Sequence, residues 1–132
     1  MIFEHTFVNS PTALVVEDNE EHIKYLQFLL KKLEINVVGY TSWREALKNA
    51  RNYDIDFALL DINLGEGMNG ITLMELLKQN QNLKEADFIS VTAYYSQDYL
   101  DDFLAAGFVD YIAKPYSIKE LEEVIHKPRV LA

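Results

Sequence analysis

The sequence predicts an α/β fold: a three-layer (βα)5 arrangement in which a doubly wound, five-stranded parallel sheet has helices on both faces. Short apolar runs alternate along the chain with amphipathic segments of helical period. The runs are continuously apolar, which is typical of strands that are buried on both faces of a parallel sheet. Several of them end on a polar side chain, at the carboxyl edge where open α/β sheets bind ligands.

Composition narrows the class of protein. At 132 residues the chain is long enough for one domain, which we place at residues 13–127, between a lead-in (1–12) and a short tail (128–132). The lack of cysteine excludes disulfides and thiolate metal sites. No stretch approaches the ~18 apolar residues of a membrane helix, and the N-terminus lacks the pattern of a signal peptide. We therefore expect a cytoplasmic protein without membrane contact.

Charge also excludes a class of partner. The formal net charge is −9, which would repel the phosphates of nucleic acid, so we expect no direct nucleic-acid binding. The excess of acidic residues has two compatible explanations. It increases solubility, and some of the acids can cluster to bind a cation.

The first strand and helix follow the lead-in. Residues from Ala13 to Glu17 form an apolar run that ends on a carboxylate, and we predict a strand there. Asn19 can cap a helix with acids in its first turn and Lys31 and Lys32 in its last, which suits the helix dipole. Its apolar face consists of residues three or four positions apart: Ile23, Leu26, Leu30 and Leu33.

The second and third strand–helix pairs are equally regular. The β-branched run from Ile35 to Tyr40 predicts a strand, and Ser42 with Glu45 predicts a capping box at the next helix. That helix would pack through Trp43, Ala46, Leu47 and Ala50. The central strand runs from Phe57 to Asp61. A loop from Asn63 to Asn69 then precedes a helix from Gly70 to about Gln79, which would pack through Ile71, Leu73, Met74 and Leu77.

The last two units complete the alternation. We predict a strand from Phe88 to Thr92 and a helix from Ser96 to Ala106, which ends at Gly107. A fifth strand covers Tyr111 to Ala113. The last helix begins at Ser117, where Glu120 completes a capping box, and Pro128 limits it.

Polar side chains end or directly follow four of the predicted strands. They are Glu17 and Asp18, then Asp61, Thr92 and Lys114. Taken singly, each has an ordinary structural explanation, such as a loop cap, a solvated strand end or a surface lysine. Together they are far more specific, because three neighbouring carboxylates repel one another unless a cation neutralises them. Oxygen ligands suit a hard ion such as Mg²⁺.

That set of groups has the parts of an acyl-phosphate site. Asp61 can attack phosphorus as a nucleophile and form an aspartyl phosphate. The negative charge on the transferred group needs a metal on one side and a cation such as Lys114 on another. Thr92 can donate a hydrogen bond to a further oxygen. His5, His22 and His126 lack metal-ligand spacing, and we expect His22 to be solvated.

The sequence resembles the receiver domain of two-component response regulators, which has the flavodoxin-like fold called CheY-like. The resemblance covers about Ala13 to His126 and rests on five motifs: Leu14-Val15-Val16-Glu17-Asp18-Asn19, Leu59-Leu60-Asp61-Ile62-Asn63-Leu64, Met68-Asn69-Gly70, Val91-Thr92-Ala93 and the segment from Ala106 to Pro115. Their order and spacing make the match specific. Glu17 stands where aspartate is more usual, and the loop after Leu64 lacks a common proline.

The resemblance implies a phosphorelay role. Asp61 would accept a phosphoryl group from a histidine kinase or a histidine phosphotransfer protein. The Mg²⁺ ligands would be Glu17, Asp18, Asp61 and the backbone carbonyl of Asn63. Lys114 would pair with the phosphoryl group, and its bond to Pro115 would be cis.

The resemblance also implies a switch. Thr92 and Tyr111 would be the switch pair, and the fourth helix, fifth strand and fifth helix would form the output face. That face would bind a downstream protein or an effector domain outside this sequence. Asn63 and Tyr94 would tune loss of the phosphoryl group, and the Tyr94 ring would shield it from water. The fifth helix has no arginine, which weakens an assignment to the transcription-factor subgroup.

We predict a signalling switch, not an enzyme that acts on a separate substrate. Two alternatives to this prediction remain. An aspartate-nucleophile phosphatase of the haloacid dehalogenase type wants a second aspartate two residues after the nucleophile, where this chain has Asn63. It also carries its metal acids late in the chain, whereas Glu17 and Asp18 come first. The other alternative is a binding module that is never phosphorylated. The intact acids, Thr92 and Lys114 argue against it.

Overall fold

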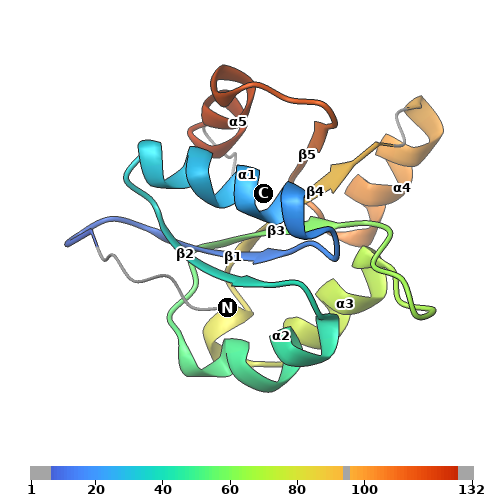
Figure 1. Cartoon of the computed structure of the whole chain (residues 1–132). Coiled ribbons are helices and arrows are strands. Elements are labelled where there is room, and N and C mark those ends of the chain that lie inside the picture. Colours follow the sequence, from blue (N-terminus) through green and yellow to red (C-terminus); the bar gives the residue numbers. More distant parts are fainter. Residues whose placement is uncertain (1–6, 94–95, 128–132) are drawn as a thin grey trace.

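The computed structural model describes residues 7–93 and 96–127, and it confirms the predicted parallel α/β fold. The sheet has five strands in the order β2-β1-β3-β4-β5, all parallel (Figure 1). Their bounds are β1 (Thr12–Val16), β2 (Asn36–Tyr40), β3 (Phe57–Asp61), β4 (Asp87–Thr92) and β5 (Asp110–Ala113). The strand ends differ by about one residue from those predicted.

Five α-helices connect and follow the strands in the described part of the chain. They are α1 (Glu20–Lys32), α2 (Trp43–Asn49), α3 (Gly70–Leu77), α4 (Gln97–Ala106) and α5 (Ile118–Ile125), with short 3₁₀ helices η1 (Ala50–Asn52) and η2 (Gln81–Leu83). Helices α1 and α5 cover one face of the sheet, and α2, α3 and α4 cover the other (Figure 1). Helix α3 ends at Leu77, before the predicted Gln79.

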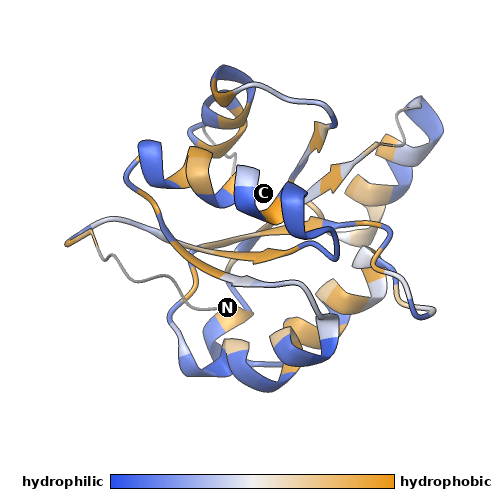
Figure 2. Cartoon of the chain, in the orientation of Figure 1, coloured by the Kyte–Doolittle hydropathy of each residue, from blue (hydrophilic) through white to orange (hydrophobic). Residues whose placement is uncertain are grey.

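Two hydrophobic clusters hold these layers together. Successive side chains of a strand point to opposite faces, so Leu60 packs toward α2–α4 while Leu59 packs toward α1 and α5. Both residues are fully buried. The hydropathy colouring in Figure 2 shows the corresponding apolar stripes along the helices. Burial on both faces is why the strands read as continuous apolar runs.

The predicted helix caps are mostly confirmed. Asn19, Ser42 and Ser117 each accept a backbone N–H at the start of their helix, and Ser117 with Glu120 forms a complete capping box. Ser96, predicted as the first residue of its helix, is instead the N-cap of α4 and accepts the Tyr99 N–H. The capping box predicted at Ser42 is only half formed. Ser42 Oγ accepts from the Glu45 N–H at 3.4 Å, whereas the Glu45 carboxylate accepts from the Asn49 side chain at 3.4 Å. The cap therefore satisfies one backbone donor instead of two.

The described end of the lead-in lies along β2. Residues 7–11 have no regular structure, but the Asn36 side chain holds them. Asn36 Oδ1 accepts from the Phe7 N–H at 2.6 Å and Asn36 Nδ2 donates to the Phe7 carbonyl at 2.9 Å. Thr12, which was predicted to end the lead-in, is the first residue of β1. Residues 1–6 and the predicted tail, 128–132, lie outside the described residues.

A search of the described residues for a helix both long and apolar enough to cross a membrane found none.

Candidate functional site

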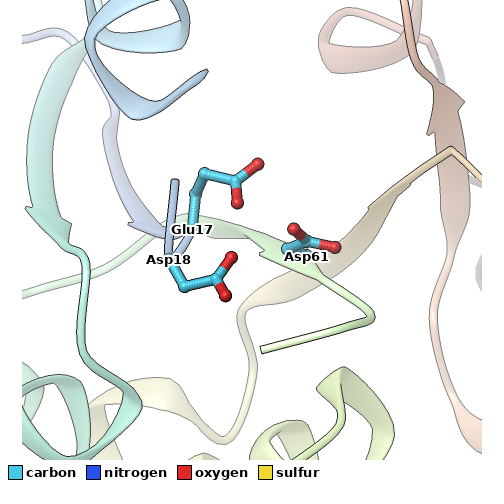
Figure 3. A group of neighbouring side chains, drawn as sticks. All are labelled: Glu17, Asp18 and Asp61. Carbon is cyan, nitrogen blue, oxygen red and sulfur yellow. The ribbon is translucent and has the colours of Figure 1, made fainter. Parts of the chain in front are cut away.

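Three carboxylates meet at the carboxyl ends of β1 and β3. These strands are neighbours, and the register pairs Val16 with Leu60, so the residues that follow are adjacent. Carboxylate oxygens of Glu17, Asp18 and Asp61 lie within 4.8 Å of one another, and Figure 3 shows the three side chains directed into a common space. Glu17 and Asp61 are buried, with exposed fractions of 4% and 9%, and Asp18 is exposed. The structure thus brings together the three acids predicted from the sequence.

Lys114, from the end of β5, completes the charge arrangement. Its Nζ forms an ion pair with Glu17 Oε1 and lies 3.4 Å from Asp61 Oδ2. The pKa of Glu17 is raised to about 7: burial is the largest cause, the Asp61 carboxylate adds to the shift, and Lys114 opposes it. One ammonium group therefore does not compensate the three carboxylates fully. A bound cation would therefore stabilise the remaining negative charge of the site.

The donor set fits a hard divalent cation. The acids line a small cavity of about 240 Å³ together with Asn19, His22, Asn63, Ala93 and Lys114. The Asn63 N–H donates to Asp61 Oδ1 at 3.0 Å, which holds the carboxylate in place. Mg²⁺ prefers oxygen ligands, and it usually keeps several water molecules. The three carboxylates supply such oxygens, and Asp18 is exposed to solvent. Glu17, Asp18 and Asp61 would hold it, and Asn63 stands beside them.

The connection from β3 to α3 depends on two residues to which the sequence analysis gave no role. Asn69 caps α3 by accepting the Thr72 N–H at 2.9 Å. Gly70 donates its N–H to the Ile62 carbonyl at 2.8 Å. A Cβ on Gly70 would lie 2.7 Å from the Asp61 carbonyl oxygen, so only glycine allows this approach. The asparagine before a helical period was a signal that could have revealed the cap.

Thr92 and Tyr111 are not among the residues that line the acid cavity. Thr92 is the buried last residue of β4, and its carbonyl accepts the Lys114 N–H at 2.8 Å. Tyr111 is half-buried and pairs in register with Ser90, whereas Thr92 pairs with Ala113. The residues of β5, Tyr111 among them, line a separate groove together with α5. Tyr94 lies outside the described residues. The Lys114–Pro115 bond is cis, as the resemblance implies.

His22 is closer to the site than predicted. It lies in the first turn of α1, and half of its side chain is exposed. Its Nδ1 is 3.1 Å from Lys114 Nζ and 3.4 Å from Glu17 Oε1. The side chain is exposed to solvent, as expected, but it also contacts two residues of the site, which was not expected. The sequence pattern missed it because α1 turns this position toward β5, and β5 is remote in sequence.

Comparison with known proteins decides the family. The sequence matches the response regulator receiver domain over residues 13–126. This chain is a receiver domain. It is 30% identical over 119 residues to the signal transduction histidine-protein kinase BarA of Escherichia coli, covering 89% of this chain. The match spans only 13% of that kinase.

A response regulator and a solved receiver-domain structure are also similar to this chain. The polar-differentiation response regulator DivK of Brucella ovis is 31% identical, with coverage of 86% of this chain and 92% of DivK. The receiver domain of a sensor histidine kinase from Pseudomonas aeruginosa superimposes with a TM-score of 0.78 at 25% identity, covering 89% of this chain and 96% of that chain. That structure has a magnesium ion coordinated in its active site cleft. The predicted family and CheY-like fold are therefore confirmed.

Proposed function

We propose that Asp61 of this receiver domain accepts a phosphoryl group from a phosphohistidine of a histidine kinase or phosphotransfer protein, within a two-component phosphorelay. One observation carries the proposal: the buried Asp61 carboxylate lies 3.4 Å from Lys114 Nζ and within 4.8 Å of the other acids. A nucleophile between a cation and a set of metal-ligating oxygens is what phosphoryl transfer needs.

The chemistry is a simple displacement. An Asp61 carboxylate oxygen attacks phosphorus, a P–O bond forms and the P–N bond to the donor imidazole breaks. The imidazole leaves with the bonding electron pair and takes up a proton. Lys114 neutralises charge on the peripheral oxygens, and the Asn63 N–H holds the second carboxylate oxygen at 3.0 Å. Water later attacks phosphorus, the bond between phosphorus and the Asp61 oxygen breaks, and inorganic phosphate leaves, which restores the free carboxylate.

Magnesium would be held by Glu17, Asp18 and Asp61, with the backbone carbonyl of Asn63 as a further ligand. When bound, it would supply positive charge that helps to neutralise the phosphoryl oxygens. The raised pKa of Glu17 supports this assignment, because it reflects a buried carboxylate that lacks sufficient neutralising charge. The magnesium-containing relative supports the same location.

Phosphorylation would act as a switch. Thr92 and Tyr111 would change position together and alter the surface of α4, β5 and α5, which would bind a downstream protein or an effector domain. The burial of Thr92 at the end of β4 supports a role inside the switch. Asn63 and Tyr94 would set the rate of phosphoryl loss. Such a signalling domain would work in the cytoplasm and would catalyse no reaction on a separate substrate.

The test is phosphate incorporation from acetyl phosphate. The intact protein is incubated with acetyl phosphate with and without Mg²⁺, and its mass is recorded. We expect a gain of one phosphoryl group that requires Mg²⁺. Asp61→Asn should abolish it. Asp54→Asn is the matched control, because Asp54 is an exposed aspartate just before the same strand; it should label normally.

Each contrary result has a clear meaning. Labelling that persists in Asp61→Asn would identify another acceptor. If neither acetyl phosphate nor candidate kinases label the wild-type protein, the domain is a binding module. Steady release of phosphate from added monoesters would favour the phosphatase alternative.

A further inference from the structure

A hydrogen bond joins α1 to the loop after β5, two elements that are distant in sequence. Tyr25 Oη donates to the Tyr116 carbonyl at 3.1 Å, across 91 positions. The two rings are also in contact, with centroids 5.7 Å apart and a tilt of 37°. Tyr116 is buried, whereas Tyr25 is 46% exposed. Tyr25 is therefore a surface residue whose hydroxyl has a definite partner.

The loop that Tyr25 holds carries the site lysine. Lys114 lies two residues before Tyr116, and its own N–H is held by the Thr92 carbonyl at 2.8 Å. Pro115, between them, has no N–H to anchor the backbone. The Thr92 and Tyr25 contacts thus fix the backbone on both sides of the proline. The Lys114 side chain extends from this segment to Glu17 and Asp61.

We propose that Tyr25 is a positioning residue for Lys114. Its hydroxyl holds the Lys114–Tyr116 loop against α1, so that the ammonium group is placed beside Asp61 before the phosphoryl group arrives. The inference rests on the proposed function, because it assigns a role in the same phosphoryl transfer. Tyr25 touches neither the carboxylates nor the phosphoryl group in this scheme; it acts only through the loop.

This role has a distinctive consequence. Lys114 would interact with the phosphoryl group, whereas Mg²⁺ would be held by the carboxylates of Glu17, Asp18 and Asp61 and by the Asn63 carbonyl. Loosening the lysine loop should therefore slow phosphoryl transfer and leave Mg²⁺ affinity unchanged. A general structural defect would weaken both. Since Tyr25 is half-exposed, removal of its hydroxyl alone leaves the packing of the ring in place.

The experiment compares Tyr25→Phe with wild type. The rate constant of phosphorylation by acetyl phosphate is measured at saturating Mg²⁺, and Mg²⁺ affinity is measured separately. We expect the rate constant to fall about three- to tenfold, the range of one hydrogen bond, and Mg²⁺ affinity to stay within about twofold. Acetyl phosphate is a small donor, so an effect on protein docking does not enter. Tyr53→Phe is the matched control, because Tyr53 is a half-buried tyrosine that precedes β3, at the opposite end of that strand from Asp61.

A double-mutant cycle with Lys114→Ala tests whether Tyr25 acts through the lysine. In that background Tyr25→Phe should cause no further loss. Equal rates in wild type and Tyr25→Phe would overturn this inference alone. A parallel loss of Mg²⁺ affinity, or an additional loss without Lys114, would also overturn it, since the role would then be structural. Failure of the wild-type protein to be labelled by either acetyl phosphate or candidate kinases would overturn the proposed function, and this inference with it.

Discussion

Lys114 Nζ lies 3.4 Å from Asp61 Oδ2 and also contacts the Glu17 carboxylate. Only 16% of the lysine side chain is exposed, so this ammonium group is held in a partly desolvated position between two acids. Coulomb interactions are stronger there than in bulk water. The contact of Lys114 with the two carboxylates has two effects. It limits repulsion between the carboxylates in the resting domain, and it places positive charge where a phosphoryl group would sit.

Removal of Lys114 should separate these two effects. In Lys114→Ala we expect phosphorylation to slow by on the order of 100-fold, the effect of losing one preorganised charge partner. The free energy of unfolding without Mg²⁺ should fall by about 1–3 kcal/mol, because buried carboxylates lose their partner. Mass spectrometry and urea unfolding measure the two quantities. Lys119→Ala, an exposed lysine of α5, is the control. An unchanged labelling rate would show that Lys114 has no role in transfer.

Stability should depend on pH through Glu17. Its pKa is raised from 4.5 to about 7, so between these values the folded protein keeps a proton that the unfolded chain has lost. The Glu17 contribution to stability therefore decreases as pH rises through this window and levels off above it. We expect the difference in unfolding free energy between wild type and Glu17→Gln to change by on the order of 1–2 kcal/mol, allowing for solvent screening.

Urea unfolding in EDTA between pH 4.5 and 8 measures this difference. Glu122→Gln, an exposed acid of α5, serves as the control. A difference between wild type and Glu17→Gln that is flat with pH, or that rises, would contradict the expected pKa shift.

Magnesium should stabilise the folded domain. At a concentration of about 100 times its dissociation constant, Mg²⁺ should add about 2.7 kcal/mol to the free energy of unfolding, and EDTA should reverse the gain. Asp18→Asn should weaken Mg²⁺ binding by about tenfold or more, because one charged ligand is lost. Thermal unfolding across a Mg²⁺ titration provides the measurement. Asp98→Asn, at the exposed start of α4, should bind normally; equal weakening in both variants would point to long-range charge alone.

Gly70 should be intolerant of a side chain. In Gly70→Ala the new Cβ would lie 2.7 Å from the Asp61 carbonyl oxygen, a backbone atom that cannot move freely. We expect a loss of about 2–3 kcal/mol of stability together with slower phosphorylation. Gly67→Ala is an informative comparison, because nothing lies within 4 Å of its Cβ and only the positive φ of 76° opposes the change. It should lose about 1 kcal/mol. The idea fails if Gly70→Ala is the milder of the two.

Loss of the phosphoryl group should depend on Tyr94, two residues after Thr92 in the sequence. If its ring shields the acyl phosphate, Tyr94→Ala should dephosphorylate severalfold faster than the parent once acetyl phosphate is removed. The decay of the phosphorylated mass with time measures the rate. Tyr53→Phe again serves as the control. Decay that is no faster in Tyr94→Ala would show that water already reaches the phosphoryl group.

The sequence by itself determined the layers, the family and the members of the acid site. Apolar runs and helical periods are local, and Asp61 follows its strand directly, so the carboxyl edge could be located without coordinates. Only the tertiary structure determined which residues are in contact at that edge of the sheet. The contact of His22 with Lys114 and the bond from Tyr25 to Tyr116 join positions about 90 residues apart, and no local pattern encodes such pairs. The close approach of Gly70 to Asp61 likewise exists only once α3 is folded onto β3, because it depends on the space left between two backbones.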